Sequence, residues 1–127
     1  MGATDREMAV AGGGSSGEVT VALIARKGRV TTVLGAYQTV VSYTVAVSAQ
    51  GFIREIGLVT TDPARTQFRL TIAGVVQFTD ELFLTSWAIP FPETSRLDSA
   101  AVVLLEAQST DGTQITVDGV ISGHERS

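Results

Sequence analysis

Apolar and polar residues alternate through most of the chain after residue 18, and this alternation predicts β-strands. In residues 41–48, one set of alternate positions holds Val41, Tyr43, Val45 and Val47, and the other holds Ser42, Thr44, Ala46 and Ser48. In residues 67–72, the two sets are Phe68, Leu70 and Ile72 against Gln67, Arg69 and Thr71. Successive side chains of a strand point to opposite faces, so each segment is expected to bury one face. Strands are expected over residues 18–25, 29–34, 37–48, 52–60, 66–73, 75–78, 100–108 and 113–121.

Pairs of residues that contain glycine or proline interrupt these segments and predict turns. They are Lys27-Gly28, Leu34-Gly35, Gln50-Gly51, Asp62-Pro63, Ala73-Gly74, Asp111-Gly112 and Asp118-Gly119. A spacing of about 8–12 residues between turn signals is typical of an antiparallel β-sandwich. The expected fold is therefore all-β: an antiparallel β-sandwich, with a jelly roll of about eight strands favoured over other sandwich topologies.

The segment AAVVLLEAQ, residues 100–108, is apolar without alternation. Such a strand has both faces covered, or has one face against a neighbouring subunit. The whole chain is 44% hydrophobic with a mean hydropathy of +0.26, which is apolar for a small soluble monomer. Because monomers seldom expose large apolar patches, the excess apolar surface predicts a homo-oligomer.

Residues 1–17 end in the glycine- and serine-rich segment AGGGSSG and predict a flexible N-terminal arm. Residues 18–127 are then expected to form a single β-sandwich domain. At this size one hydrophobic core can fold without disulfides or bound metals. The start of the chain has no apolar signal core, and no apolar run approaches the ~18 residues that span a bilayer. We therefore expect a cytoplasmic protein without a membrane partner.

The charge and the cysteine content exclude several classes of function. The net charge is −4 and the sequence pI is near 4.8, so nucleic-acid binding is not expected. Arg26, Lys27 and Arg29 form the one basic cluster, and we interpret it as a solvated strand end or turn. The chain has no cysteine, which excludes disulfides, thiolate metal sites and cysteine nucleophiles.

The residues suited to catalysis form no convincing set. His124 is the single histidine and lies three residues from the end, where terminal disorder is expected. The paired carboxylates considered are Asp80 with Glu81, Glu93 with Asp98, and Asp111 with Asp118, all at turn signals or strand ends. The segment STDGTQITVDG fits a hairpin better than a calcium loop, because Asp-Gly between apolar residues favours a tight turn. We predict no enzymatic activity, no cofactor and no metal.

The segment TSWAIPFPETSRL contains the only tryptophan and two prolines that cannot donate a backbone hydrogen bond. It is expected to be an edge strand or a connection across the end of the sandwich. The candidate contact residues are Phe83, Trp87, Pro90, Phe91 and Pro92. A packed corner, a subunit interface and a sugar-binding platform are the three alternatives for these side chains.

The segments FRLTIAGVVQF, IPFPETSRLDSAAVVLLEAQSTDGT and ITVDGVISGHE, within residues 37–125, resemble the jelly-roll and sandwich subunits of tailed-phage virions. The resemblance is to capsid decoration (cement) proteins and to accessory domains of tails or fibres. It implies a non-enzymatic protein, often a trimer, whose N-terminal arm reaches a neighbour or the shell. The implied partners are copies of the chain and a major capsid or tail protein, and the implied location is the virion.

A second class of function stays open from the sequence. A carbohydrate- or receptor-binding sandwich of a phage tail or fibre has many of the same features, and its partner is a glycan. The surroundings of Trp87 and the oligomeric state distinguish the two classes.

Overall fold

The computed structural model describes residues 20–82, 86–91 and 96–127. The arm predicted over residues 1–17 lies outside these residues. The strands are β2 (Val21–Thr32), β3 (Gln38–Thr44), β4 (Gln50–Thr60), β5 (Thr66–Ile72), β6 (Val75–Glu81), β7 (Ser86–Pro90), β8 (Arg96–Leu97), β9 (Val102–Ser109) and β10 (Ile115–Arg126). A short 3₁₀ helix, η1 (Pro63–Arg65), joins β4 to β5. None of the described residues forms a helix that is long and apolar enough to cross a membrane.

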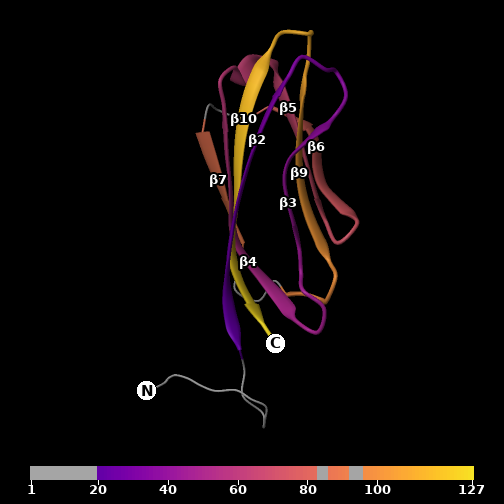
Figure 1. The fold of residues 1–127 in the computed structure, drawn as a ribbon. Coiled ribbons are helices and arrows are strands. Elements are labelled where there is room, and N and C mark those ends of the chain that lie inside the picture. The colour runs from indigo at the N-terminus through magenta and orange to yellow at the C-terminus, as the bar shows by residue number, and fades with distance from the viewer. Residues whose placement is uncertain (1–19, 83–85, 92–95) are drawn as a thin grey trace.

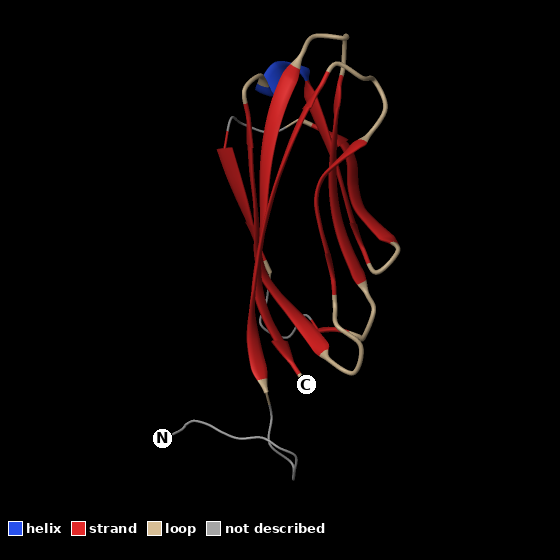
Figure 2. Cartoon of the chain, viewed as in Figure 1, coloured by secondary structure: helices blue, strands red, loops and turns tan. Residues whose placement is uncertain are grey.

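The eight longer described strands pair as nested hairpins folded over into two sheets (Figure 1). β2 pairs with β10, β3 with β9, β4 with β7 and β5 with β6, all antiparallel. The first sheet has the order β2-β10-β4-β7, with β8 also beside β4, and the second has the order β3-β9-β5-β6. Figure 2 shows the two sheets facing each other as layers. This order is a jelly roll, and the expected all-β antiparallel sandwich is confirmed.

The core lies between the two sheets and is built from alternate residues of each strand. Phe68 and Leu70 of β5 are buried, as the alternation predicts. Val41 and Tyr43 of β3 are buried too, as is Val45, the residue that follows β3. They meet inward side chains of the facing sheet, which include Ile56, Leu58, Ile115, Val117 and Ile121. Packed aliphatic side chains of this kind supply most of the stability of a sandwich.

Val47 does not follow the predicted alternation. Its side chain is 83% exposed, because β3 ends at Thr44 and the chain turns before β4 begins. The turn is closed by a hydrogen bond from the Ala49 N–H to the Ala46 carbonyl oxygen, and Ser48 adopts a positive φ of 67°. The alternation of buried side chains therefore ends at Val45, although the apolar–polar alternation of the sequence continues to Val47.

Three of the predicted turns lie in strands, and one of them, Gln50-Gly51, forms the start of β4 directly after the turn. Lys27-Gly28 is within β2, which joins the two strands expected over 18–25 and 29–34, and Asp118-Gly119 is within β10. Gly28 and Gly119 are opposite each other in the ladder between these strands. The hairpin expected in residues 109–119 is also wrong, because the Asp111-Gly112 turn connects β9 of the second sheet to β10 of the first. The predicted turn at Ala73-Gly74 is correct and joins β5 to β6.

The basic cluster of Arg26, Lys27 and Arg29 is neither a strand end nor a turn. It occupies the middle of β2, which is an edge strand of the first sheet among the described strands. The Arg29 guanidinium forms two hydrogen bonds with the Asp118 carboxylate, at 2.7 and 3.1 Å. Charged side chains on an edge strand oppose the addition of a strand from another molecule, which gives this cluster a structural role.

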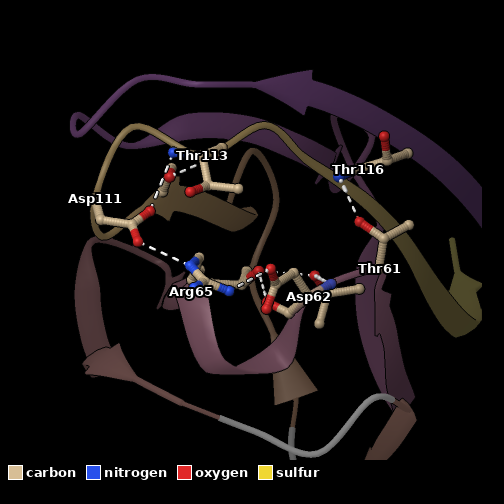
Figure 3. A network of polar contacts seen from close by, with 9 residues as sticks. Thr61, Asp62, Arg65, Asp111, Thr113 and Thr116 are labelled. Atoms are coloured by element: carbon tan, nitrogen blue, oxygen red, sulfur yellow. Dashed lines mark hydrogen bonds and ion pairs between the residues drawn. The ribbon is translucent and has the colours of Figure 1, made fainter.

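A polar network joins two crossings between the sheets at one end of the sandwich (Figure 3). Arg65 of η1 donates from Nη1 to Asp62 at 3.0 Å and from Nε to Asp111 at 2.8 Å. Asp111 also accepts a hydrogen bond from the Thr113 N–H at 3.0 Å. The network therefore ties the β4–β5 connection to the β9–β10 connection, and it accounts for Arg65 and Asp111 without invoking a ligand.

Candidate functional site

The segment predicted to carry contact residues contains β7, an edge strand of the first sheet among the described strands. An edge strand was one of the two structures expected for this segment, the other being a connection across the end of the sandwich. Phe83 and Pro92 lie outside the described residues. Trp87 pairs with Leu58 through the backbone, but its side chain lies outside the described part of the chain. Pro90 is exposed at the end of β7, opposite Glu55.

Phe91 is the predicted contact residue that the structure brings to a hollow. Its N–H donates to the Arg54 carbonyl oxygen at 2.9 Å, which holds the chain beside β4 after the end of β7. The ring is half-buried and packs against the core. It also lines a surface hollow of about 540 Å³, together with Phe52, Ile53, Arg54, His124 and Arg126. We name this hollow the Phe52 groove.

The Phe52 groove depends on a β-bulge between β4 and β10. Ser122 is opposite Glu55 but the next residue, Gly123, is opposite Ile53, so Arg54 is an extra residue in β4. A bulge bends its strand and changes the direction of the side chain at that position. A Cβ atom on Gly123 would lie 2.1 Å from the Phe52 carbonyl oxygen, so only glycine allows the strands to approach this closely.

Two rings form the centre of the groove. Phe52 and His124 are opposite each other on β4 and β10, and their ring centroids are 4.9 Å apart with an interplanar angle of 13°. The guanidinium carbon of Arg126 lies 5.6 Å from the centroid of the Phe52 ring, which is a cation–π distance. On the other side of β4, Arg96 of β8 is opposite Phe52. A row across three strands thus combines aromatic rings with arginine side chains.

The groove is basic although the protein is acidic. No carboxylate of a described residue lies within ion-pair distance of Arg54 or Arg126. The closest contact between Arg96 and Asp98 is 3.9 Å. Glu125 lies between His124 and Arg126 in sequence, but its Oε2 atom accepts a hydrogen bond from the Ala46 N–H at 3.1 Å. Its carboxylate is therefore engaged away from the groove.

Sequence reasoning missed most of this site. His124 is in strand β10, which continues to Arg126, so the expected terminal disorder is wrong. The backbone of Ser127 also exchanges two hydrogen bonds with that of Thr20, at 3.0 and 3.3 Å. The signal in the sequence was the continuation of the strand pattern through VISGHER. The partners of His124 required the strand register, which no local pattern contains.

The outer face of the second sheet has a second candidate surface, which is apolar. Leu104 of β9 lies beside Thr71 of β5, which lies beside Val76 of β6. A hollow of about 510 Å³ opens there, lined by Thr71, Ala73, Gly74, Ser99, Ala100, Ala101, Val102 and Leu104. We name these residues with Val76 the Leu104 patch. Two alternatives were expected for residues 100–108: both faces covered, or one face against a neighbouring subunit. Val102, at the start of β9, is 40% exposed and is not covered within the subunit, whereas the rest of β9 is buried or half-buried.

The rest of that outer face is polar and internally satisfied. The Arg69 Nε atom donates to Glu106 Oε1 at 2.8 Å, and the Arg69 guanidinium carbon lies 4.3 Å from the Tyr37 ring centroid. Gln108 donates to Gln67 at 2.8 Å. These side chains bind one another, so the apolar part of the face is the part left without a partner.

Of the carboxylate pairs considered from the sequence, Glu93 lies outside the described residues, and Asp111 and Asp118 have the wrong pKa shifts for an acid and base pair. Hydrogen bonds from the Thr113 hydroxyl and N–H, and then from Arg65, lower the pKa of Asp111. The hydrogen bond from Arg29 lowers the pKa of Asp118. A general acid of a glycosidase needs a raised pKa, so neither carboxyl suits that role. Among the described side chains, no group of three or more His, Cys, Asp or Glu could hold a metal ion.

No protein-family model matches the sequence, and a search of curated proteins found no match. The fold and the two surfaces define the class of protein by structure: a small jelly-roll domain with one basic, aromatic groove and one apolar patch.

Proposed function

We propose that this protein is a non-enzymatic assembly subunit, a jelly roll that binds copies of itself and the surface of a larger protein particle. The observation that carries the proposal is the Leu104 patch. Its described lining contains no charged side chain, and it lies on the outer face of a sheet rather than in the core. Exposed apolar patches on small domains mark contacts with other proteins.

The chemistry of the patch supports a protein partner. Val76, Val102 and the hairpin at Ala73-Gly74 are small or β-branched, and they form an apolar surface with little side-chain entropy to lose on binding. An apolar sheet face of this kind suits another apolar surface, as in the packing of one sheet on another. Closed symmetry lets the same patch of each copy face one axis.

The oligomeric state tests the proposal. Native mass spectrometry and light scattering at micromolar concentration are expected to show a homo-oligomer. Val102→Glu places a charge in the patch and is expected to give a monomer. Val120→Glu is the matched control, because Val120 is 38% exposed on the outer face of the first sheet and is expected to leave assembly unchanged.

Val76→Glu provides a second variant, since Val76 is exposed on the edge strand β6 and tolerates a charge without disturbing the core. A wild-type monomer at these concentrations would contradict self-assembly. Equal dissociation by the Val120 and Val102 variants would place the interface elsewhere.

The particle that we propose is a tailed-phage virion. Within it, we propose that the protein is a capsid decoration protein and forms a trimer. The support for these proposals is the resemblance of residues 37–125 to virion subunits, together with the jelly-roll topology. Negative-stain microscopy of virions with and without the protein tests them. Extra density at symmetry positions of the shell is expected, and loss of the protein without any change in the particle would contradict the decoration role.

A second candidate function is a carbohydrate- or receptor-binding module, and the Phe52 groove favours it. The groove combines aromatic rings, arginines and a volume of about 540 Å³, features that ligand sites share. The two functions use different faces, so variants of one surface test one function at a time.

A further inference from the structure

The described arginines divide into those that are neutralised within the fold and those that are not. Arg29, Arg65 and Arg69 each form a hydrogen bond of 2.7–2.8 Å with a carboxylate. Arg54 and Arg126, at the Phe52 groove, have no such partner among the described residues, and neither does Arg26 of β2. The Arg26 guanidinium carbon lies 5.8 Å from the centroid of the Tyr43 ring, so it is away from the groove. In a chain of net charge −4, this local excess of positive charge points to an anionic ligand.

We propose that the Phe52 groove binds a carboxylated oligosaccharide, of the hexuronate class. The inference rests on the second candidate function and names the chemistry of its ligand. Arg54 and Arg126 bind the carboxylate, since a guanidinium matches a carboxylate with two parallel hydrogen bonds. The Phe52 and His124 rings contact the apolar C–H face of a sugar ring.

The extent of the groove argues for a short ligand. Nucleic acids and other long polyanions need a track of basic residues, with affinity that grows with each phosphate neutralised. Here Arg54 and Arg126 are the two arginines that line the hollow, and Arg26 on β2 instead lies over the Tyr43 ring. Glu55 follows Arg54 directly and Asp118 lies farther along β10, so no basic track continues from the groove. A hollow of about 540 Å³ holds a ligand of a few sugar units.

The strands below the groove argue for a sugar rather than an acidic peptide. β10 is paired on both sides, with β2 and β4, and β4 is paired with β10 on one side and with β7 and β8 on the other. The β4 residues on both sides of the bulge are therefore in ladders, and the bulged Arg54 accepts a hydrogen bond from the Phe91 N–H through its carbonyl oxygen. An extended peptide gains much of its affinity by adding to a free strand edge, which the groove does not provide. A sugar needs only side-chain donors and an apolar surface.

The preformed geometry supports rigid recognition. Phe52 and His124 are stacked, and Arg126 lies over the Phe52 ring, so these side chains are held before a ligand arrives. Side chains that are already ordered lose less entropy on binding. Gly123 holds β10 close to the bulge and thereby sets the spacing of His124 from Phe52.

Calorimetric or NMR titration of the full chain with trigalacturonate tests the inference. The probes for comparison are neutral galactotriose, triglutamate and inorganic phosphate. Binding of trigalacturonate is expected to be at least about tenfold tighter than binding of the other three, and to weaken with added salt. Chemical-shift changes are expected at Phe52 and His124.

Arg126→Gln and Arg54→Gln are each expected to weaken trigalacturonate binding by about tenfold or more, because each removes a charged hydrogen bond. Lys27→Gln is the matched control, since Lys27 is an exposed cation on edge strand β2 of the same sheet, and a change of less than about twofold is expected. All three positions are exposed, and thermal unfolding of the variants checks that the fold is intact.

Each other outcome overturns the inference in a distinguishable way. Equal binding of galactotriose and trigalacturonate would leave a sugar-binding function without the acidic preference. Tighter binding of triglutamate would assign the groove to a peptide carboxylate. Binding of phosphate alone would reduce it to an anion site. No binding of any probe would overturn both the inference and the ligand-binding candidate, and would leave the assembly proposal untouched.

Discussion

Gly28 and Gly119 are 91 residues apart in sequence and directly opposite each other on neighbouring strands β2 and β10. Both face the interior at the place where β3 of the other sheet comes close. A Cβ atom on Gly28 would lie 1.9 Å from the Val40 carbonyl oxygen, and one on Gly119 would lie 2.9 Å from a methyl carbon of Val41. Val40 is the bulged residue of β3, with no partner in the ladder to β9. The glycine pair thus makes room for a bulge in the facing sheet.

Substitution of Gly28 tests this relationship. Gly28→Ala is expected to lower the free energy of unfolding by about 3 kcal/mol, since the new methyl group meets backbone atoms that cannot move independently. Gly57→Ala is the control, because its Cβ would meet only a Val120 carbon at 3.9 Å, an ordinary contact. Urea unfolding followed by the fluorescence of Trp87 measures both. Equal midpoints for the two variants would contradict the close packing at Gly28.

The two tyrosines give a matched pair of hydroxyl groups. The Tyr37 hydroxyl donates to Asp80 Oδ1 at 2.5 Å and accepts from the Asp80 N–H at 2.8 Å, where Asp80 has a positive φ of 56°. The Tyr43 hydroxyl is buried without a hydrogen-bond partner among the described residues. Tyr37→Phe is therefore expected to cost about 1 kcal/mol of stability, whereas Tyr43→Phe is expected to be neutral or stabilising.

Thermal and urea unfolding of the two variants check this prediction. The pH dependence gives a second measurement, because burial and then the hydrogen bond to Asp80 raise the pKa of Tyr37 above 10.0. The stabilisation from the neutral hydroxyl is complete below pH 10 and is lost as the pH rises through the folded-state pKa. A larger loss of stability in Tyr43→Phe than in Tyr37→Phe would contradict the assignment.

Asp111 is expected to contribute to acid unfolding. Hydrogen bonds from Thr113, and then from Arg65, lower its pKa below the ordinary value of 3.8. A lowered carboxyl pKa contributes stability that is present above the unfolded-state pKa and is lost as the pH falls through the folded-state pKa. Asp111→Asn is therefore expected to be less stable than wild type near neutral pH, with the difference closing below about pH 4.

Urea unfolding at a series of pH values measures the effect of Asp111→Asn. Asp118→Asn is expected to behave in the same way, because the hydrogen bond from Arg29 lowers the pKa of Asp118. The difference in stability between wild type and Asp111→Asn is expected to be smaller at about pH 3 than at about pH 6. An equal difference at the two pH values would contradict this account.

The basic cluster of β2 is expected to limit aggregation. Arg26→Thr with Lys27→Thr removes two charges from an edge strand and retains a residue suited to strands. We expect this double variant to aggregate faster on heating, as measured by light scattering. Arg54→Thr with Arg96→Thr removes the same charge away from β2 and is the control. Equal aggregation of the two double variants would assign the effect to net charge alone.

Part of the fold was predictable because it depends on local patterns. The alternation in residues 66–72 follows from the geometry of a strand with one buried face, and Phe68 and Leu70 are buried as expected. The turn at Ala73-Gly74 follows from the ease with which glycine adopts a positive φ, here 81°. The prolines of residues 85–97 correctly placed that segment at the edge of a sheet, since proline cannot complete a central ladder.

The candidate site was largely beyond prediction. Of the five predicted contact residues, Phe91 is the one that the structure brings to the groove, and Phe83 and Pro92 lie outside the described residues. His124 and Phe52 are 72 residues apart and meet only because the bulge at Arg54 sets the register of β4 against β10.

The sequence by itself determined the all-β class and the buried face of segments such as β5, because these follow from the period of the side chains. The tertiary structure alone decided what the glycines do. A glycine beside a charged residue has the same local pattern in a turn as in a close contact between strands, and Gly28 and Gly119 proved to be the second. It also decided which arginines are neutralised, since Arg29 and Arg65 find carboxylates on other elements while Arg54 and Arg126 find none among the described residues. Pairing across strands is a property of register and layer, and neither is written in any single segment of the chain.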